Sequence, residues 1–165
     1  MLIDRQWVQT ALADMYSMIQ LARQIYLHAA HVFDSQIMAP LMGNRMVTDT
    51  AMRLFSPMRR TQQWLMFTAS KPFRKAMYDF VRKKIDDDDR DFSLATSSMA
   101  KFTCSDLAVQ VCLKALEIMG PEGAQERNSI EKHVRDVKLT QIYEGTNQLN
   151  RHELFKKHIK GAISE

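Results

Sequence analysis

The N-terminal segment of the chain repeats apolar positions with the period of an α-helix. Spacings of three and four residues place such positions on one helical face, opposite the polar residues Gln9, Asp14, Gln20 and Gln24. The apolar series is Val8, Leu12, Met15, Ile19, Ala22, Tyr26, Ala29 and Phe33. The pattern predicts one long amphipathic helix over residues 6–33, which Asp34-Ser35, followed by Pro40 and Gly43, would end.

The middle of the chain predicts shorter helices. Ser56-Pro57 closes a helix over residues 48–55, a second runs over 59–69, and a third begins after the break at Lys71-Pro72. The acid run from Asp86 to Asp91 predicts a solvated loop, because neighbouring aspartates repel one another, and it lacks the spacing and glycine of a calcium loop. The methionines of this region suit either adaptable core packing, the commoner case, or a partner surface: Met38, Met42, Met46, Met52, Met58, Met66 and Met77.

The last third of the chain is again predicted to be helical. A long helix is predicted from Ser93 to Met119, where Gly120-Pro121 stops it. Asn128 is predicted to cap a short helix over residues 130–138, and Thr146 a last one from Gln148 to about Ile159. The whole pattern predicts an all-α fold in a single domain over residues 1–165.

Composition excludes several classes of protein. The 45% hydrophobic and 25% charged content is ordinary for a globular domain, and the net charge of +4 is scattered, which argues against nucleic-acid binding. No run of eighteen apolar residues and no secretory leader is visible, so we expect neither a membrane span nor export. Cys104 and Cys112 lie too far apart on one helix to pair, which favours buried thiols in a reducing compartment, cytoplasmic or equivalent. No Glu-x-x-His pair of a di-metal site occurs, and His28 and His31, three apart on the first helix, are too few ligands for a metal.

One acid stands where chemistry is plausible. Glu144 lies at the tip of a predicted connection between two helices, beside Gly145, which lets a ligand or another backbone come close. Taken alone, such an acid is more often a solvated loop residue and the glycine a helix terminator. Both interpretations stay open on these residues.

Longer motifs extend this picture. Gly120-Pro121-Glu122-Gly123, Arg135-Asp136 and the run from Ile142 to Gln148 occur in the order and spacing seen in the C-terminal helical domain of acyl-CoA dehydrogenases, which this chain resembles. The N-terminal helix, with Leu2-Ile3-Asp4-Arg5-Gln6 and Leu12-Ala13-Asp14-Met15, also resembles that family. The resemblance implies a four-helix bundle, with residues 36–92 as a helical insertion where the family has a short connection. Arg135 stands next to Asp136 at the end of a short helix, which suits an ion pair or a carbonyl cap better than contact with substrate.

The resemblance also implies a site. Glu144 falls on the catalytic base that removes the α-proton of an acyl-CoA thioester, and Gly145 would lie along that thioester. Thr146, Gln148 and Gln6 fall on positions that touch FAD, with Gln6 equally well explained as a polar residue of a first helical turn. Glu117, Ile118, Met119, Gly120 and Pro121 fall on the segment that holds the FAD diphosphate and ribose of an adjoining subunit. The implied partners are an electron-transfer flavoprotein or similar acceptor and further copies of the chain, in a homodimer or homotetramer.

Two positions depart from the family. Glutamine is usual where Glu117 stands and a second glycine where Pro121 stands, so either Glu117 binds a ribose hydroxyl or the segment has another partner. Two alternatives to a dehydrogenase are an acyl-CoA oxidase-like flavoprotein domain and a noncatalytic helical interaction module. Because the family builds most of its pocket from other domains, we expect this chain to be inactive alone. It would act as the C-terminal domain of a longer enzyme.

Overall fold

A computed structural model describes residues 1–42 and 71–163 of the chain, and these residues are helical with no strand among them. The all-α prediction is therefore confirmed. The elements are η1 (Leu2–Asp4), α1 (Gln6–Phe33), η2 (Asp34–Met38), α2 (Ala39–Met42), α5 (Lys71–Lys84), α6 (Asp87–Met119), η4 (Gly120–Ala124), α7 (Ile130–Thr140), α8 (Asn147–Leu154), η5 (Phe155–Ile159) and α9 (Lys160–Ile163). The predicted helices over residues 48–55 and 59–69 lie outside the described residues.

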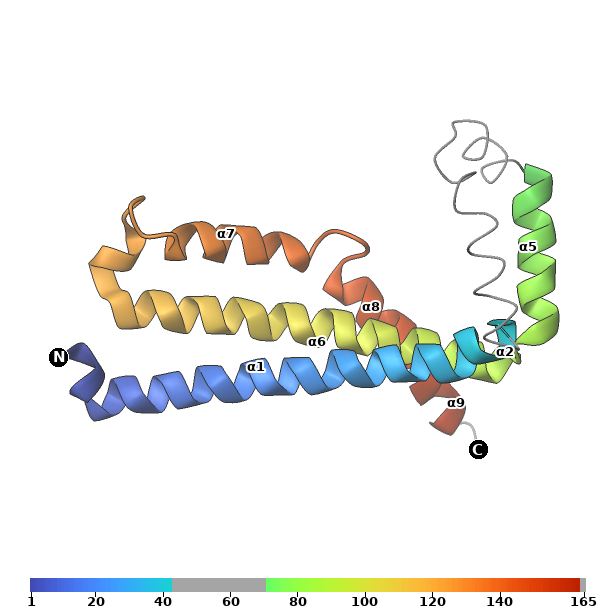
Figure 1. Cartoon of the computed structure of the whole chain (residues 1–165), viewed down its shortest axis with the longest axis horizontal. Coiled ribbons are helices and arrows are strands. Elements are labelled where there is room, and N and C mark those ends of the chain that lie inside the picture. Colours follow the sequence, from blue (N-terminus) through green and yellow to red (C-terminus); the bar gives the residue numbers. More distant parts are fainter. Residues whose placement is uncertain (43–70, 164–165) are drawn as a thin grey trace. The chain divides into compact units, whose positions relative to one another are not determined.

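The chain divides into two units, one formed by residues 1–30 and 94–165 and the other by residues 31–93. In the first unit α1 and α6 lie side by side, and the segment from α7 to α8 follows the other side of α6 (Figure 1). Cys104 on α6 donates a hydrogen bond to the carbonyl oxygen of Ala22 on α1 at 3.4 Å. The part of α6 from Leu94 to Met119 thus forms the centre of this unit.

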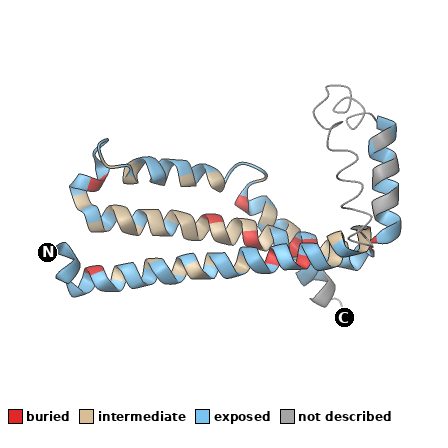
Figure 2. Cartoon of the chain, viewed as in Figure 1, coloured by how far each residue is buried: buried red, intermediate tan, exposed pale blue. Residues whose placement is uncertain are grey.

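Burial in the first unit is concentrated on small side chains. Figure 2 shows buried positions on both α1 and α6. Ala29 on α1 and Ala95 and Ala100 on α6 are buried, and so is Val8 near the start of α1. Several large apolar residues of α1 remain exposed, among them Tyr16 with 64% of its surface accessible. This narrow core positions α6 firmly against α1 and leaves much apolar surface at the outer faces.

The first helix has the predicted bounds and ends at Phe33, but the backbone beyond it stays helical, which was not predicted. The backbone continues through the π-helical turn η2 into α2, with the Ala39 N–H donating to the carbonyl of Asp34. The Ser35 hydroxyl donates to the Val32 carbonyl at 3.1 Å. Because Pro40 has no N–H, the widened turn lets the helical path pass it without a regular ladder.

The acid run was also misassigned as a loop. Asp87, Asp88 and Asp89 form the first turn of α6, where exposed backbone N–H groups and the helix dipole favour negative charge. Arg90 reaches back to Asp87 with an N–O distance of 2.8 Å. The carboxylates therefore start the helix, six residues before the predicted start at Ser93.

The second unit contains the helical end of α1, η2, α2, α5 and the first turns of α6, with residues 43–70 outside the described part. Val32, Ile85 and Ser93 are its buried residues among those described. Of the seven methionines assigned to packing or a partner surface, Met38 alone has a described side chain, and it is half-buried. The prediction that residues 36–92 are an insertion stays a prediction.

Candidate functional site

The connection between α7 and α8 carries an unusual backbone at Glu144. Its φ is +55°, the left-handed conformation that L-residues other than glycine rarely adopt, and Gly145 follows at +90°. The Glu144 side chain is exposed. Such backbone strain persists only where surrounding contacts hold it, and it is found most often at functional sites.

Local hydrogen bonds fix both ends of this turn. The Asn147 backbone N–H donates to the Gln141 carbonyl at 3.0 Å, which closes the connection between the two helices. The Thr146 hydroxyl accepts a bond from the Leu149 N–H at 3.3 Å, so the prediction that Thr146 caps the last helix is confirmed. The cap of α7 was assigned wrongly. Ser129 is its N-cap residue, without a capping bond from its side chain, and the Asn128 amide donates to the Glu122 carbonyl.

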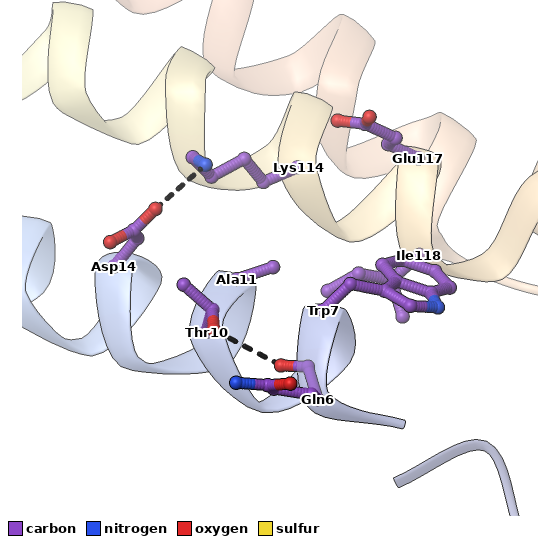
Figure 3. Close-up of a pocket in the computed structure, with 8 residues that line it drawn as sticks. All are labelled: Gln6, Trp7, Thr10, Ala11, Asp14, Lys114, Glu117 and Ile118. Carbon is purple, nitrogen blue, oxygen red and sulfur yellow. Dashed lines mark hydrogen bonds and ion pairs between the residues drawn. The ribbon is translucent and has the colours of Figure 1, made fainter.

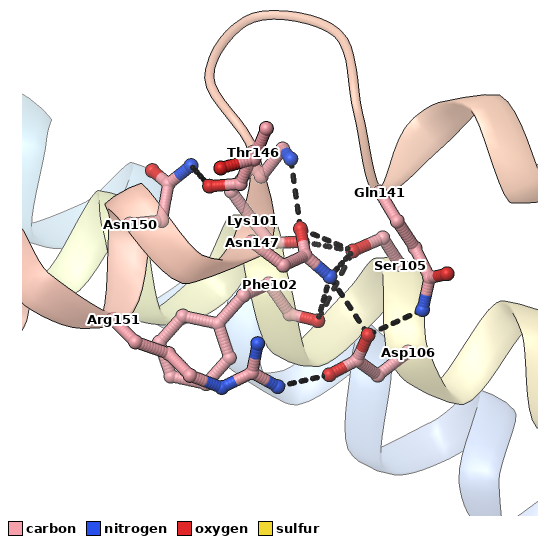
Figure 4. A network of polar contacts seen from close by, with 9 residues as sticks. All are labelled: Lys101, Phe102, Ser105, Asp106, Gln141, Thr146, Asn147, Asn150 and Arg151. Carbon is pink, nitrogen blue, oxygen red and sulfur yellow. Dashed lines mark hydrogen bonds and ion pairs between the residues drawn. The ribbon is translucent and has the colours of Figure 1, made fainter.

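A polar network beneath the turn centres on Asn147, of which only 3% is exposed (Figure 4). Its Oδ1 accepts from the Lys101 ammonium at 2.8 Å, and its Nδ2 donates to Ser105 Oγ at 2.8 Å and to Asp106 Oδ1 at 2.7 Å. Lys101 Nζ also donates to the Gly145 carbonyl at 2.7 Å. One buried amide therefore joins the turn to three side chains of α6.

Asp106 collects donors from both sides of the turn. Gln141 Nε2 donates to its Oδ1 at 2.6 Å, and the Arg151 guanidinium pairs with its Oδ2. Partial burial raises the Asp106 pKa, but the bonds from Gln141, Arg151 and Asn147 and the charge of Arg151 together lower it below its ordinary value. The carboxylate is thus held ionised as an acceptor.

Two further contacts complete this network. The Arg151 guanidinium carbon lies 4.7 Å from the centre of the Phe102 ring, within range of a cation–π interaction. Asn150 Nδ2 donates at 3.0 Å to the carbonyl oxygens of Gly145 and Thr146. Sequence reasoning missed Lys101, Ser105 and Asp106. These residues could have been found as a group of polar side chains on one side of the helix predicted from Ser93 to Met119, which was predicted from its apolar positions alone.

A second candidate region lies between the start of α1 and the end of α6 (Figure 3). It is an open pocket of about 490 Å³ lined by Gln6, Trp7, Thr10, Ala11, Asp14, Lys114, Glu117 and Ile118. The structure thus brings Gln6 together with Glu117 and Ile118, three of the residues that the resemblance assigns to FAD. Lys114 pairs with Asp14 across the pocket at 3.1 Å.

The charges of this pocket suit some parts of FAD better than others. The Gln6 amide and the Thr10 hydroxyl offer polar groups, but the Lys114 cation is already paired with Asp14. Glu117 is exposed and brings negative charge, and Pro121 has no N–H to donate. A ribose hydroxyl therefore fits beside Glu117, whereas a diphosphate does not. Gly120, at φ +56°, has open space around its Cα.

The residues assigned to the cofactor fall into two groups within this chain. Lys101, which contacts the turn before Thr146 and Gln148, and Glu117 are sixteen residues apart on α6, which corresponds to about 24 Å at the rise of an α-helix. Thr146 and Gln148 are exposed at the turn, and Met119 to Pro121 lie at the far end of α6. The structure does not bring these two groups together.

Arg135 forms an ion pair, which is one of the two structural roles expected for it. Its guanidinium pairs with Glu131 one helical turn earlier, at 2.6 and 3.0 Å, while Asp136 pairs with Lys132. Residues four apart share a helix face and adjacent residues do not, so Asp136 points away from Arg135. Both pairs are exposed and lie on α7 away from the turn.

Cys104 and Cys112 line a separate apolar groove of about 430 Å³ between α1 and α6. Partial burial raises the pKa of both thiols, which keeps them protonated and poorly nucleophilic. Among the described residues there is no group of three histidine, cysteine or acidic side chains arranged to hold a metal ion. Nor is any helix in that part of the chain long and apolar enough to cross a membrane.

Fold and site together define a helical domain that presents a carboxylate on a braced turn between two helices. The model of the acyl-CoA dehydrogenase C-terminal domain matches residues 68–158, more than half of the chain. The chain belongs to the acyl-CoA dehydrogenase family.

Several relatives match parts of this chain. It is 43% identical over 67 residues to a cyclohex-1-ene-1-carbonyl-CoA dehydrogenase of Geobacter metallireducens and 47% identical over 66 residues to an acyl-CoA dehydrogenase of Bacillus subtilis. These matches cover 41% and 40% of this chain but only 17% of each relative. No solved structure matches the chain.

Proposed function

We propose that this chain acts as the C-terminal part of a flavin-dependent acyl-CoA dehydrogenase and that Glu144 is its catalytic base. The observation that carries the proposal is the left-handed backbone of Glu144 on a turn held by a buried network, inside the region that the family model matches. An isolated loop acid has no need of such backbone strain, whereas a base that must meet one C–H bond does.

In the proposed reaction the Glu144 carboxylate takes a proton from the α-carbon of an acyl-CoA thioester. The electron pair of that C–H bond forms the new double bond as a hydride leaves the β-carbon, giving a 2-enoyl-CoA. FAD, when bound, would supply the acceptor for this hydride, and an electron-transfer flavoprotein or similar acceptor would be the partner that receives the electrons. Gly145 lies along the thioester, where the absence of a side chain leaves room for it.

The exposure of the site sets a condition on this chemistry. Glu144 is solvated, and Ile142 and Tyr143 beside it are 58% and 54% exposed. A solvated carboxylate is a weak base, so water must be excluded to strengthen it. We infer that substrate and a further protein surface cover the turn. The chain by itself is expected to be inactive.

The cofactor contacts follow the two groups of residues. Thr146 and Gln148 would meet the flavin beside the base, and Gln6 would offer its amide to the cofactor from the pocket at the start of α1. Ile118, Met119 and Gly120 would face the ribose side of a cofactor from an adjoining subunit, with Glu117 on a ribose hydroxyl and Pro121 shaping the turn. This division requires a homodimer or homotetramer. Two thiols without metal or disulfide favour a reducing compartment, either the cytoplasm or the mitochondrial matrix.

The proposal can be tested in a chimera, in which residues 94–158 of this chain replace the homologous region of the Bacillus subtilis relative. We expect the chimera to oxidise acyl-CoA and the Glu144→Gln version to lose turnover while it stays yellow with bound flavin. Glu126→Gln, which alters an exposed acid away from the turn, is the matched control and should remain active. A folded, yellow chimera without activity, or an active Glu144→Gln chimera, would contradict the proposal. Turnover with oxygen alone would favour an oxidase.

A further inference from the structure

Lys101 makes contacts that a surface lysine does not need. Its ammonium donates to the Gly145 carbonyl at 2.7 Å and to Asn147 Oδ1 at 2.8 Å, and the side chain is half-buried. Both acceptors belong to a segment more than forty residues away along the chain. The Lys101 ammonium therefore bonds to the turn after α7 and not to a neighbour in its own helix.

The position of the first acceptor matters most. The Gly145 carbonyl belongs to the residue that directly follows Glu144, and Asn150 Nδ2 donates to the same oxygen at 3.0 Å. Two donors, one on α6 and one on α8, fix the direction of this carbonyl and hence the peptide plane after Gly145. With Asn147 N bonded to Gln141 O, the backbone path from residue 141 to residue 147 has little freedom left.

We propose that Lys101 is a positioning residue that holds Glu144 in its left-handed conformation through the Gly145 carbonyl. A carbonyl–ammonium bond is charge-assisted and stronger than a neutral bond, so it offsets the steric cost of a positive φ at a residue with a side chain. Without the ammonium, Asn150 alone holds the carbonyl, and Glu144 relaxes to the ordinary negative-φ region. The consequence for catalysis rests on the proposed role of Glu144 as base.

The rest of the network holds Lys101 in place. Ser105 Oγ donates to the Lys101 backbone carbonyl at 2.9 Å, and Asn147 is held from its other side by Asp106. Asp106 is in turn bonded by Gln141 at the start of the turn. Lys101 is thus the residue of α6 that bonds the Gly145 carbonyl, and Ser105, Asp106 and Asn147 hold it in place.

The test uses isotope-labelled full-length chain and nuclear magnetic resonance. Three-bond couplings and cross-correlated relaxation report the sign of φ at Glu144, and amide exchange at Asn147 reports opening of the turn. In Lys101→Met we expect loss of the positive-φ signature and exchange faster by about tenfold or more, with helical circular dichroism unchanged. The matched control is Lys132→Met, which removes an exposed lysine of α7 and should alter neither readout.

A second variant covers loss of folding. Lys101→Gln keeps a donor without the charge. If Lys101→Met does not fold, the same two readouts are taken on Lys101→Gln, in which we also expect loss of positive φ at Glu144. Persistence of positive φ at Glu144 in a folded Lys101 variant, with Asn147 exchange within about twofold of the parent, would overturn the inference. That failure is independent of the Glu144→Gln result, which decides the role of Glu144 as base and leaves the backbone readout untouched.

Discussion

The two ends of α6 within the first unit differ in how their polar groups are satisfied. Near Lys101 and Asp106 the polar side chains face a buried amide and the carbonyls of a turn, and the network joins residues from α6, α7 and α8. Near Lys114 and Glu117 a single ion pair of 3.1 Å crosses an open pocket. The first end is preorganised before any ligand arrives, whereas the second leaves its groups to solvent or to a partner.

The difference matters because the two ends receive different parts of the proposed reaction. A base must meet one C–H bond in a fixed direction, so its turn gains from a rigid support. A cofactor-binding segment that another subunit would complete gains little affinity from a rigid, preorganised pocket in the single chain. The following predictions alter one end and compare it with the other.

The largest expected effect is at Asn147. Replacing it with leucine removes the buried amide and leaves Asp106, Ser105 and Lys101 without their shared partner. We expect the free energy of unfolding to fall by about 3 kcal/mol, the range for breaking a buried polar network. Urea denaturation measures this. Asn128→Leu, which removes a single exposed bond to Glu122, should lower the free energy of unfolding by under about 1 kcal/mol. Equal losses in the two variants would mean that the network stabilises the fold no more than one exposed hydrogen bond does.

The two positive-φ glycines sharpen the comparison. At Gly145 the φ is +90° and an added Cβ would lie 3.4 Å from Asn150 Nδ2, while at Gly120 the φ is +56° with nothing within 4 Å. Gly145→Ala should therefore destabilise by about 2 kcal/mol and Gly120→Ala by about 1 kcal/mol. Thermal unfolding of both variants provides the measurement, and the reverse order would refute the packing argument.

Acid stability should depend on Asp106. Its folded pKa is lowered, so it lies below the unfolded value of about 3.9. The stabilisation is fully present above that unfolded value and is lost as the pH falls through the folded value. Asp106→Asn should thus be less stable near neutral pH but lose less stability between neutral pH and about pH 3.

The matched variant for this prediction is Asp136→Asn. The Lys132 bond lowers the Asp136 pKa as well, but this carboxylate is exposed and solvent screens its pair. Denaturation midpoints across pH should therefore follow the parent closely. A parent-like acid profile in Asp106→Asn would show that the network does not keep Asp106 ionised.

The smallest effect is expected at the open end. Lys114→Met breaks the pair with Asp14, whose side chains are 31% and 52% exposed. Such a pair contributes about 0.5 kcal/mol or less, and the loss should shrink further in salt. A loss as large as that of Asn147→Leu would mean that this end is as tightly built as the turn.

Sequence reasoning found the helices where one periodicity runs unbroken. The bounds of α1 follow from its apolar spacing, and the end of α6 follows from Gly120-Pro121. Prediction from the sequence failed where one residue type is compatible with two local structures. Aspartates at a helix start are stabilised by the dipole although they disfavour helix interiors, and Pro40 can be passed by a π-helical turn.

The site was predictable only in part. Glu144 could be singled out because its motif is contiguous, and Thr146 because capping is local. The bonds that join Lys101 and Asp106 to the turn span 44 and 35 residues along the chain, and they depend on which side of α6 faces that turn. Periodicity places Lys101 on a helix but does not say what it faces.

The central claim is that Glu144 removes the α-proton, and one measurement isolates that step. An acyl-CoA analogue with sulfur in place of the β-carbon cannot lose hydride, so incubation in deuterium oxide records proton removal alone as deuterium gained at the α-carbon. In the chimera that carries residues 94–158, we predict α-exchange with Glu144 in place and with the Glu126→Gln control. The Glu144→Gln chimera, still yellow, should exchange no faster than free analogue; exchange at the parent rate would contradict the account.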